Sequence, residues 1–105
     1  MTVQKAVHPG EILRTQFMEK HGLSASALAI RMHVPAPRVN DIVRERRGVS
    51  PDSALRLARF FRTTAQYWMD LQTAYDLAVA EALAGEQILR EVQPALTHTD
   101  VALAA

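Results

Sequence analysis

The chain has no cysteine, which excludes disulfide bonds and metal sites built from thiolates. It also has no apolar run close to the roughly 18 residues that cross a bilayer. The first ten residues, MTVQKAVHPG, lack the apolar stretch of a signal peptide. These absences favour a cytoplasmic protein, and a length of 105 residues suits one domain with a tail.

Strand patterns are scarce as well, because no segment alternates cleanly between apolar and polar residues. Alanine, leucine, arginine, glutamate and glutamine are common, and all of them favour helices. We therefore expect an all-α fold. It would comprise a helical domain over residues 1–82 and an extension over residues 83–105 that is first helical and then disordered.

Signals for helix ends divide the chain into five helices and a tail. The first helix begins at His8-Pro9-Gly10-Glu11, where proline suits the first turn, and Gly22 can end it. Ser24 is a suitable N-cap for the second helix, which runs to Met32. A short turn with two prolines follows.

The third helix is expected over residues 36–46. At about 100° per residue, its inward face carries the apolar residues Val39, Ile42 and Val43. The outward face and its borders carry Pro37, Arg38, Asn40, Asp41 and Arg44. Arg46 and Arg47 lie at the C-terminus, where cations are favoured. Gly48 would supply the left-handed residue that ends the helix.

The fourth helix opens with Ser50-Pro51-Asp52, which places an N-cap, a first-turn proline and an early acid in order. Two inward faces fit its pattern, one with Leu55, Ala58 and Phe61, the other with Leu57 and Phe60.

The fifth helix starts near Thr63 or Thr64 and continues past Ala80. Its stripe of Trp68, Leu71 and Tyr75 is mainly a core feature that could also border a dimer interface. One more helix would follow Gly85 and end before Pro94, and residues 97–105 would fray.

Charge is unevenly distributed along the chain. Residues 31–62 contain eight arginines and three acids, a net charge of +5. Residues 76–105 contain five acids and one arginine, a net charge of −4. A basic middle and an acidic end suit two partners of opposite sign, although a solvated surface would also explain them.

Catalytic and metal sites find little support. The four histidines, His8, His21, His33 and His98, are far apart and form no metal-binding pair with one another. No phosphate-binding glycine loop, dinucleotide motif or nucleophile elbow is present. We expect neither enzymatic activity nor a cofactor or metal.

The second helix, the turn and the third helix match a helix-turn-helix unit, whose second helix enters the major groove of DNA. An ordinary helical hairpin with a charged face fits the same pattern equally well. Arginine can bond guanine and asparagine can read adenine. Arg38, Asn40 and Arg44 are therefore the candidate base readers, and Arg46 and Arg47 the candidate phosphate contacts.

Each candidate has an alternative role. Arg38 could form a salt bridge across the helix start, Asn40 could bond another helix, and Arg46 and Arg47 could only compensate the dipole. Asp41 is expected to pair with Arg44 or Arg38 rather than to read cytosine. The hydroxyls of Ser24 and Ser26 could contact a phosphate or could serve only as helix caps. Arg56, Arg59 and Arg62 are expected to form a solvated face.

Several sequence blocks in order resemble the HigA/VapI-type antitoxins, which are Xre-family helix-turn-helix proteins related to the phage lambda repressor. The blocks cover about residues 8–80. They are HPGEIL, the RVN-x-I segment at Arg38, Arg47-Gly48, and W-x-x-LQ-x-x-YDL from Trp68.

The resemblance implies a five-helix fold, a homodimer and a palindromic operator. It also implies a second partner, a HigB-type mRNA-cleaving toxin, which the antitoxin neutralises while the pair represses its own operon. One departure is Pro37, where the family usually has a polar residue such as Asn or Ser. Pro37 can contact a thymine methyl but cannot donate a backbone hydrogen bond, so base reading would rest on its neighbours. A stand-alone Xre-type repressor and a helical protein-interaction module remain alternatives.

Overall fold

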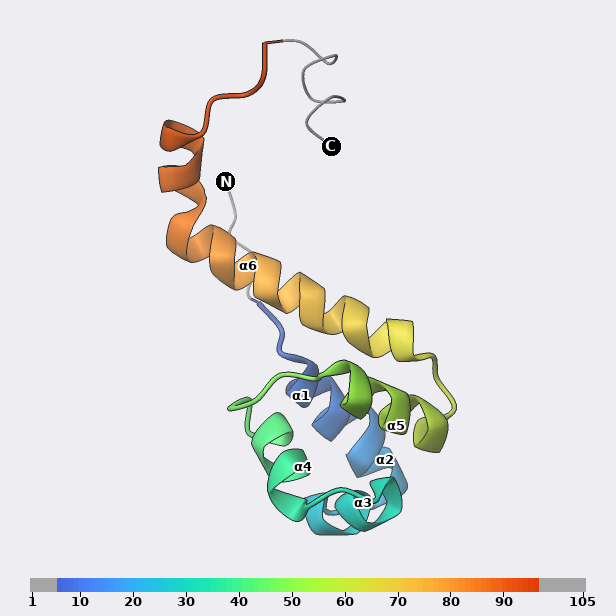
Figure 1. The fold of residues 1–105 in the computed structure, drawn as a ribbon. Coiled ribbons are helices and arrows are strands. Elements are labelled where there is room, and N and C mark those ends of the chain that lie inside the picture. Colours follow the sequence, from blue (N-terminus) through green and yellow to red (C-terminus); the bar gives the residue numbers. More distant parts are fainter. Residues whose placement is uncertain (1–5, 97–105) are drawn as a thin grey trace.

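A computed structural model of the chain describes residues 6–96, and every regular element within them is a helix (Figure 1). Three segments follow one another without a break as one N-terminal helix: α1 (Pro9–Ile12), η1 (Leu13–Met18) and α2 (Glu19–His21). The remaining helices are α3 (Ala25–Met32), α4 (Ala36–Val43), α5 (Pro51–Phe61) and α6 (Ala65–Glu91). The predicted all-α fold of five helices is thereby confirmed for this part of the chain.

The N-terminal helix begins and ends where the sequence predicts. The His8 imidazole caps it, because Nδ1 accepts a hydrogen bond of 2.8 Å from the backbone N–H of Gly10. Gly22 ends it with a φ of 62°, in the left-handed region that glycine adopts without strain. Between them, η1 is a π-helix, which no sequence signal predicted.

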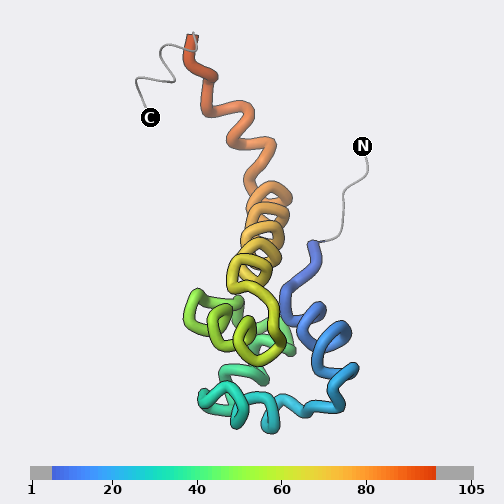
Figure 2. The backbone as a smooth tube through the Cα atoms, turned by 90° about the vertical axis from the view of Figure 1, so that its right-hand side faces the viewer, coloured from blue at the N-terminus to red at the C-terminus, as the bar shows by residue number. Residues whose placement is uncertain are grey.

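The core lies where the five helices meet, below the first half of α6 (Figure 2). Trp68 is fully buried there, and the centroid of its ring lies 4.9 Å from the centroid of the Phe17 ring. The Trp68 indole N–H donates to the Thr63 hydroxyl at 2.8 Å, so burying this polar group leaves no hydrogen bond unmade. Other large side chains that are fully buried include those of Leu13, Leu28, Val39, Ile42 and Leu57.

The end of α4 differs from the prediction of a helix over residues 36–46. The helix stops at Val43, and Glu45 takes the left-handed conformation with a φ of 62°. Gly48 has no positive φ, so its predicted role as the helix terminator is wrong. A Cβ there would lie 2.8 Å from the Gln72 side-chain oxygen, so the end of that side chain would have to shift.

α5 and α6 correct two further expectations. On α5, Leu57 is buried and Phe60 packs against the core, as one predicted face requires. Of the other face, Leu55 is 63% exposed, whereas Ala58 and Phe61 are partly buried against the core, so the inward side of α5 combines members of both. α6 passes through Gly85 as one helix, so the separate helix predicted after that glycine is wrong. The predicted fraying of residues 97–105 lies outside the described residues.

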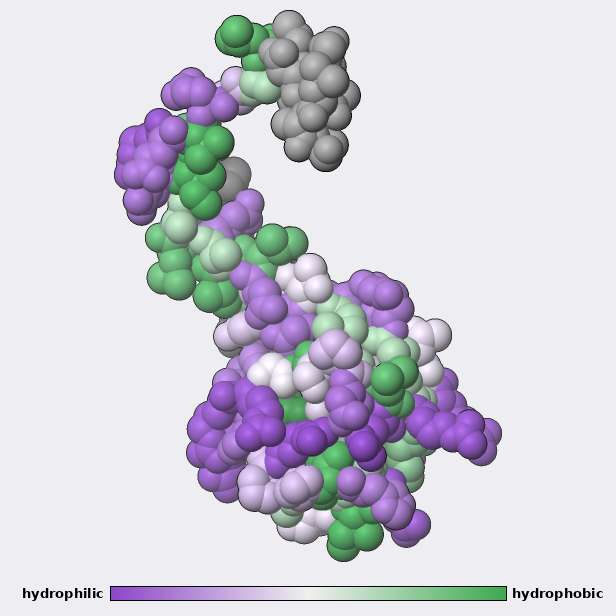
Figure 3. Space-filling view, viewed as in Figure 1, coloured by the Kyte–Doolittle hydropathy of each residue, from purple (hydrophilic) through white to green (hydrophobic). Residues whose placement is uncertain are grey.

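α6 extends well beyond the other helices (Figure 1). Apolar side chains are exposed along this far part, as the green surface in Figure 3 shows. On α6 they are Leu77, Leu83, Ile88 and Leu89, and just past its end follow Val92 and Leu96. None of the helices between residues 6 and 96 is long and apolar enough to cross a membrane.

Candidate nucleic-acid interface

α3, the following turn and α4 form a hairpin of two eight-residue helices. The Ser24 hydroxyl caps α3 by accepting from the Ala27 N–H at 3.1 Å. His33 ends α3 with a φ of 59°, and the Val34 N–H returns to the Ala29 carbonyl at 3.1 Å. This hydrogen-bonded left-handed end turns the chain into α4, which is the connection that a helix-turn-helix unit requires.

α4 presents the faces that its sequence predicts. Val39, Ile42 and Val43 are buried, with Ile42 fully so. On the other side, Pro37 and Arg44 are exposed, whereas Arg38, Asn40 and Asp41 are half-buried. Of the residues proposed as base readers, Arg44 therefore lies on the solvent-facing side, and Arg38 and Asn40 lie at its borders.

Asp41 binds the two arginines that follow α4. Its Oδ1 lies 2.9 Å from Arg46 Nη2, and its Oδ2 lies 3.6 Å from Arg47 Nη2. The expectation that Asp41 pairs with Arg44 or Arg38 is therefore wrong, although its role as an ion-pair partner holds. Both arginine side chains remain at least half exposed, at 58% and 50%, so they stay available to a phosphate.

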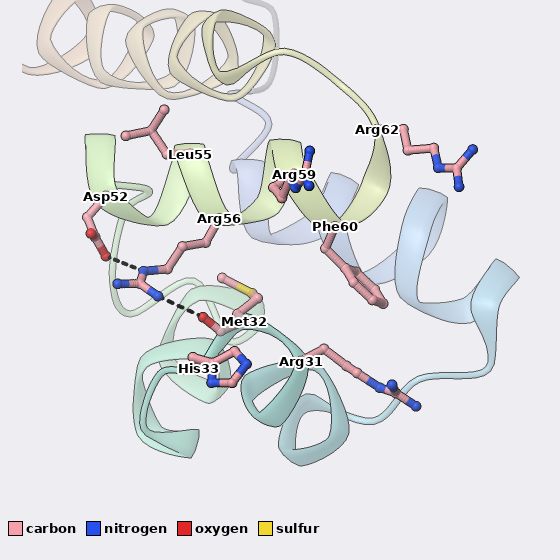
Figure 4. A pocket seen from close by; sticks show the side chains of 9 residues that line it. All are labelled: Arg31, Met32, His33, Asp52, Leu55, Arg56, Arg59, Phe60 and Arg62. Atoms are coloured by element: carbon pink, nitrogen blue, oxygen red, sulfur yellow. Dashed lines mark hydrogen bonds and ion pairs between the residues drawn. The ribbon is translucent and has the colours of Figure 1, made fainter.

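Arg38 has a partner on α5 rather than on its own helix. Asp52 Oδ2 accepts from Arg38 Nη1 at 2.5 Å and from Arg56 Nε at 2.9 Å. These hydrogen bonds, that of Arg56 first, hold the pKa of Asp52 below its ordinary value. Arg56 also donates to the Met32 carbonyl at 2.9 Å (Figure 4), so it is not part of a merely solvated face.

Arg14, on the N-terminal helix, contacts the C-terminal end of α4. Its Nη1 donates to the Val43 carbonyl at 2.6 Å, at the last residue of α4. Positive charge is favoured at a helix C-terminus, where carbonyl groups lack intrahelical partners. Sequence reasoning missed Arg14, since nothing in a local pattern connects residues 29 positions apart. In contrast, the i, i+4 spacing of Asp52 and Arg56 is a local pattern from which their ion pair could have been predicted.

A shallow groove of about 950 Å³ runs between α3 and α5. Its rim carries four arginines, of which Arg56 alone is drawn with hydrogen bonds in Figure 4. The lining consists of Arg31, Met32, His33, Asp52, Leu55, Arg56, Arg59, Phe60 and Arg62. Over residues 6–96, no group of three histidines or acids could hold a metal ion.

The residues proposed for a dimer interface separate into two kinds. Trp68 has no exposed surface, so its assignment to an interface is corrected to the core. Leu71 and Tyr75 are half-buried and keep surface that a second copy could cover. The Tyr75 ring also packs edge-on against His8, with ring centroids 4.8 Å apart.

His8 makes folding stability depend on pH. Burial lowers its pKa from the ordinary 6.5, against the raising effects of Glu45 and Asp76. The unfolded chain therefore takes up a proton at a higher pH than the folded one. The contribution of His8 to the free energy of unfolding should be fully present above pH 6.5 and should decrease as the pH falls below that value. Urea unfolding between pH 5 and 8 measures this, and His8→Asn, which keeps a capping group, should flatten the profile. An unchanged slope in that variant would contradict the assignment.

Comparisons with known proteins agree with this geometry. A family model described as helix-turn-helix matches residues 16–68. Virulence-associated protein I of Dichelobacter nodosus is 57% identical over 76 residues, which are 72% of this chain and 70% of that protein. The chain therefore belongs to the helix-turn-helix family, in its HigA/VapI-type group.

Two solved structures narrow the comparison to antitoxins. Pseudomonas aeruginosa antitoxin HigA, solved with the higBA promoter, has a TM-score of 0.86 and 53% identity, covering 88% of this chain and 100% of that one. Antitoxin GraA in complex with its operator has a TM-score of 0.86 and 46% identity, covering 92% of this chain and 98% of that one.

Proposed function

We propose that this protein is the antitoxin of a type II toxin-antitoxin pair. It binds a palindromic operator as a homodimer, represses its own operon and neutralises a HigB-type mRNA-cleaving toxin. The observation that carries the proposal is the α3–turn–α4 hairpin, whose arginine-rich outer side faces solvent. The promoter and operator complexes of the similar antitoxins HigA and GraA support it.

The proposed DNA contacts follow from the exposed side of the hairpin. Arg38, Asn40 and Arg44 read base edges, and Pro37 contacts a methyl group. Arg46 and Arg47 bind phosphate while Asp41 keeps both near α4. Capping already occupies the Ser24 hydroxyl, so Ser24 and Ser26 would meet phosphate mainly through the N-terminus of α3.

A homodimer matches this function because one hairpin reads too few bases to be specific. Two copies would place their α4 helices one helical turn of DNA apart, about 34 Å. Leu71, Tyr75 and the exposed apolar side chains of α6 are the proposed dimer surface. In this division, residues 1–82 bind DNA, residues 83–105 form an extension, and no catalytic step is needed. Operator binding would place the protein in the cytoplasm.

Binding to DNA should be sequence-preferring and should weaken steeply with salt. The measurement is fluorescence anisotropy with a duplex of the protein's own promoter region and a scrambled duplex, each at two salt concentrations. Arg47→Ala should weaken binding to both duplexes alike and lower the salt slope by about one. Arg38→Ala should instead reduce the preference for the promoter.

Equal behaviour of both variants and the parent would contradict the assignment of α4 as the reading helix. Co-purification with the toxin encoded beside the gene separates an antitoxin from a stand-alone repressor, because the repressor would bind the operator and no toxin. Failure to bind either duplex at low salt would leave a protein-interaction module.

A further inference from the structure

Asp52 occupies a fixed position at the start of α5. Ser50 caps this helix, Pro51 is its first residue and Asp52 its second. The backbone there is rigid, because the Ser50 hydroxyl accepts from the Ser53 N–H at 3.2 Å and proline restricts φ. The Asp52 carboxylate therefore projects from a well-held point next to the first turn of α4.

Arg56 fixes the direction of that carboxylate. It lies one turn further along α5, with Nε on Asp52 and Nη1 on the Met32 carbonyl at the end of α3 (Figure 4). A planar guanidinium that is bonded at two of its nitrogens has little rotational freedom. Asp52 is thus held by the rigid backbone at the start of α5 and by its hydrogen bond with Arg56. Its carboxylate in turn restrains the side chain of Arg38.

Of the three hydrogen-bonded residues Arg56, Asp52 and Arg38, only Arg38 lies on α4, at the border of its outer side. Only its Nη1 bonds to Asp52, and a guanidinium has five N–H donors, so further donors remain for a second acceptor. Its side chain keeps 29% of its exposure. A free arginine would lose about 2 kcal/mol of rotamer entropy on being ordered, whereas one already oriented by an acid has lost much of it before binding.

We propose that Asp52 is a specificity-determining positioning residue: it orients Arg38 for reading a base edge without contacting the DNA itself. This inference rests on the proposed function, in which α4 enters the major groove. It adds to that function a residue outside the reading helix. Asp52 acts through Arg38, and Arg56 acts through Asp52.

The sign of the effect distinguishes positioning from simple electrostatics. Removing an acid from a DNA-binding face strengthens binding to every duplex, because repulsion from the phosphates falls. A positioning residue behaves differently. Asp52→Asn should bind scrambled DNA as well as or better than the parent, while its preference for the promoter duplex decreases.

The experiment compares the full-length parent with Asp52→Asn, Arg38→Ala, the double variant and Glu11→Gln. Glu11 is also an acid in the first turn of its helix, so Glu11→Gln is a matched control for the lost charge. The measured quantity is the ratio of affinities for the promoter and scrambled duplexes. Circular dichroism and thermal unfolding establish that each variant is folded.

Asp52→Asn and Arg38→Ala should each reduce this ratio at least about fivefold, since one good arginine–base pair discriminates by that much. The double variant should be no worse than Arg38→Ala, and Glu11→Gln should keep the parental ratio. A parental ratio in Asp52→Asn, or additive losses in the double variant, would overturn the inference. A parent without preference for the promoter would overturn the proposed function itself. If Asp52→Asn does not fold, Arg56→Lys, which keeps the charge but cannot span both acceptors, is judged by the same criterion.

Discussion

Replacing Gly10 by alanine should destabilise the protein by about 3 kcal/mol or more, at the upper end of the cost of overpacking. A Cβ at this position would lie 1.9 Å from the Ile42 carbonyl oxygen and 2.9 Å from its carbonyl carbon. Both atoms belong to the backbone of α4, so no side chain can rotate away. α1 and α4 would have to separate, and the proposed reading helix would move with them.

Gly85→Ala is the matched control for this prediction. Gly85 lies inside α6, and the nearest atom to an added Cβ is the Glu81 side chain at 3.7 Å, an ordinary contact. Alanine should stabilise that helix by about 0.5–1 kcal/mol. Urea unfolding followed by circular dichroism measures both changes. Equal stability of Gly10→Ala and the parent would show that α1 and α4 are not in backbone contact.

Trp68→Ala should have a comparably large effect, with about 3–5 kcal/mol lost. The ring is fully buried among Phe17, Tyr67 and the core of the bundle, and removing it leaves a cavity that fixed helices cannot close. Trp68→Phe keeps most of the volume but leaves Thr63 without the indole N–H. It should cost about 1–3 kcal/mol, clearly less than the alanine variant.

The same variants test whether Trp68 belongs to the core or to an interface. Thermal unfolding at a fixed protein concentration gives the stability, and sedimentation gives the oligomeric state. If Trp68 is a core residue, its replacement lowers the unfolding temperature whatever the fraction of dimer. A Trp68→Ala protein that unfolds like the parent but dissociates more readily would return Trp68 to the interface. Leu71→Ala, at a half-buried position, should show the smaller effect on stability.

Local chemistry explains why so much of the fold could be predicted. Ser24, Ser50 and Thr64 each cap the helix that follows through a hydrogen bond to a backbone N–H, which is a short-range interaction. The burial of Val39 and Ile42 also follows from spacing along a single helix. Helix ends and inward faces are therefore readable from a few neighbouring residues.

The ion pairs and the helix terminator were less predictable, because each depends on distant segments or on competing local options. Arg38 pairs with an acid 14 positions away, and Arg14 reaches a carbonyl 29 positions away. Glu45 rather than Gly48 takes the left-handed conformation, although glycine adopts it with less strain. Gly85 costs only about 1 kcal/mol within a helix. The strong helix formers around it, without an N-cap residue after it, keep α6 continuous.

The unbroken course of α6 has a geometric consequence. At 1.5 Å per residue, its 27 residues extend for about 40 Å along the helix axis, and that axis changes direction in the second half of the helix (Figure 1). Its first part is anchored in the bundle by Trp68, whereas the side chains near Glu91 are exposed. A molecule bound at the far end would therefore be joined to the bundle by helical residues rather than by an irregular linker.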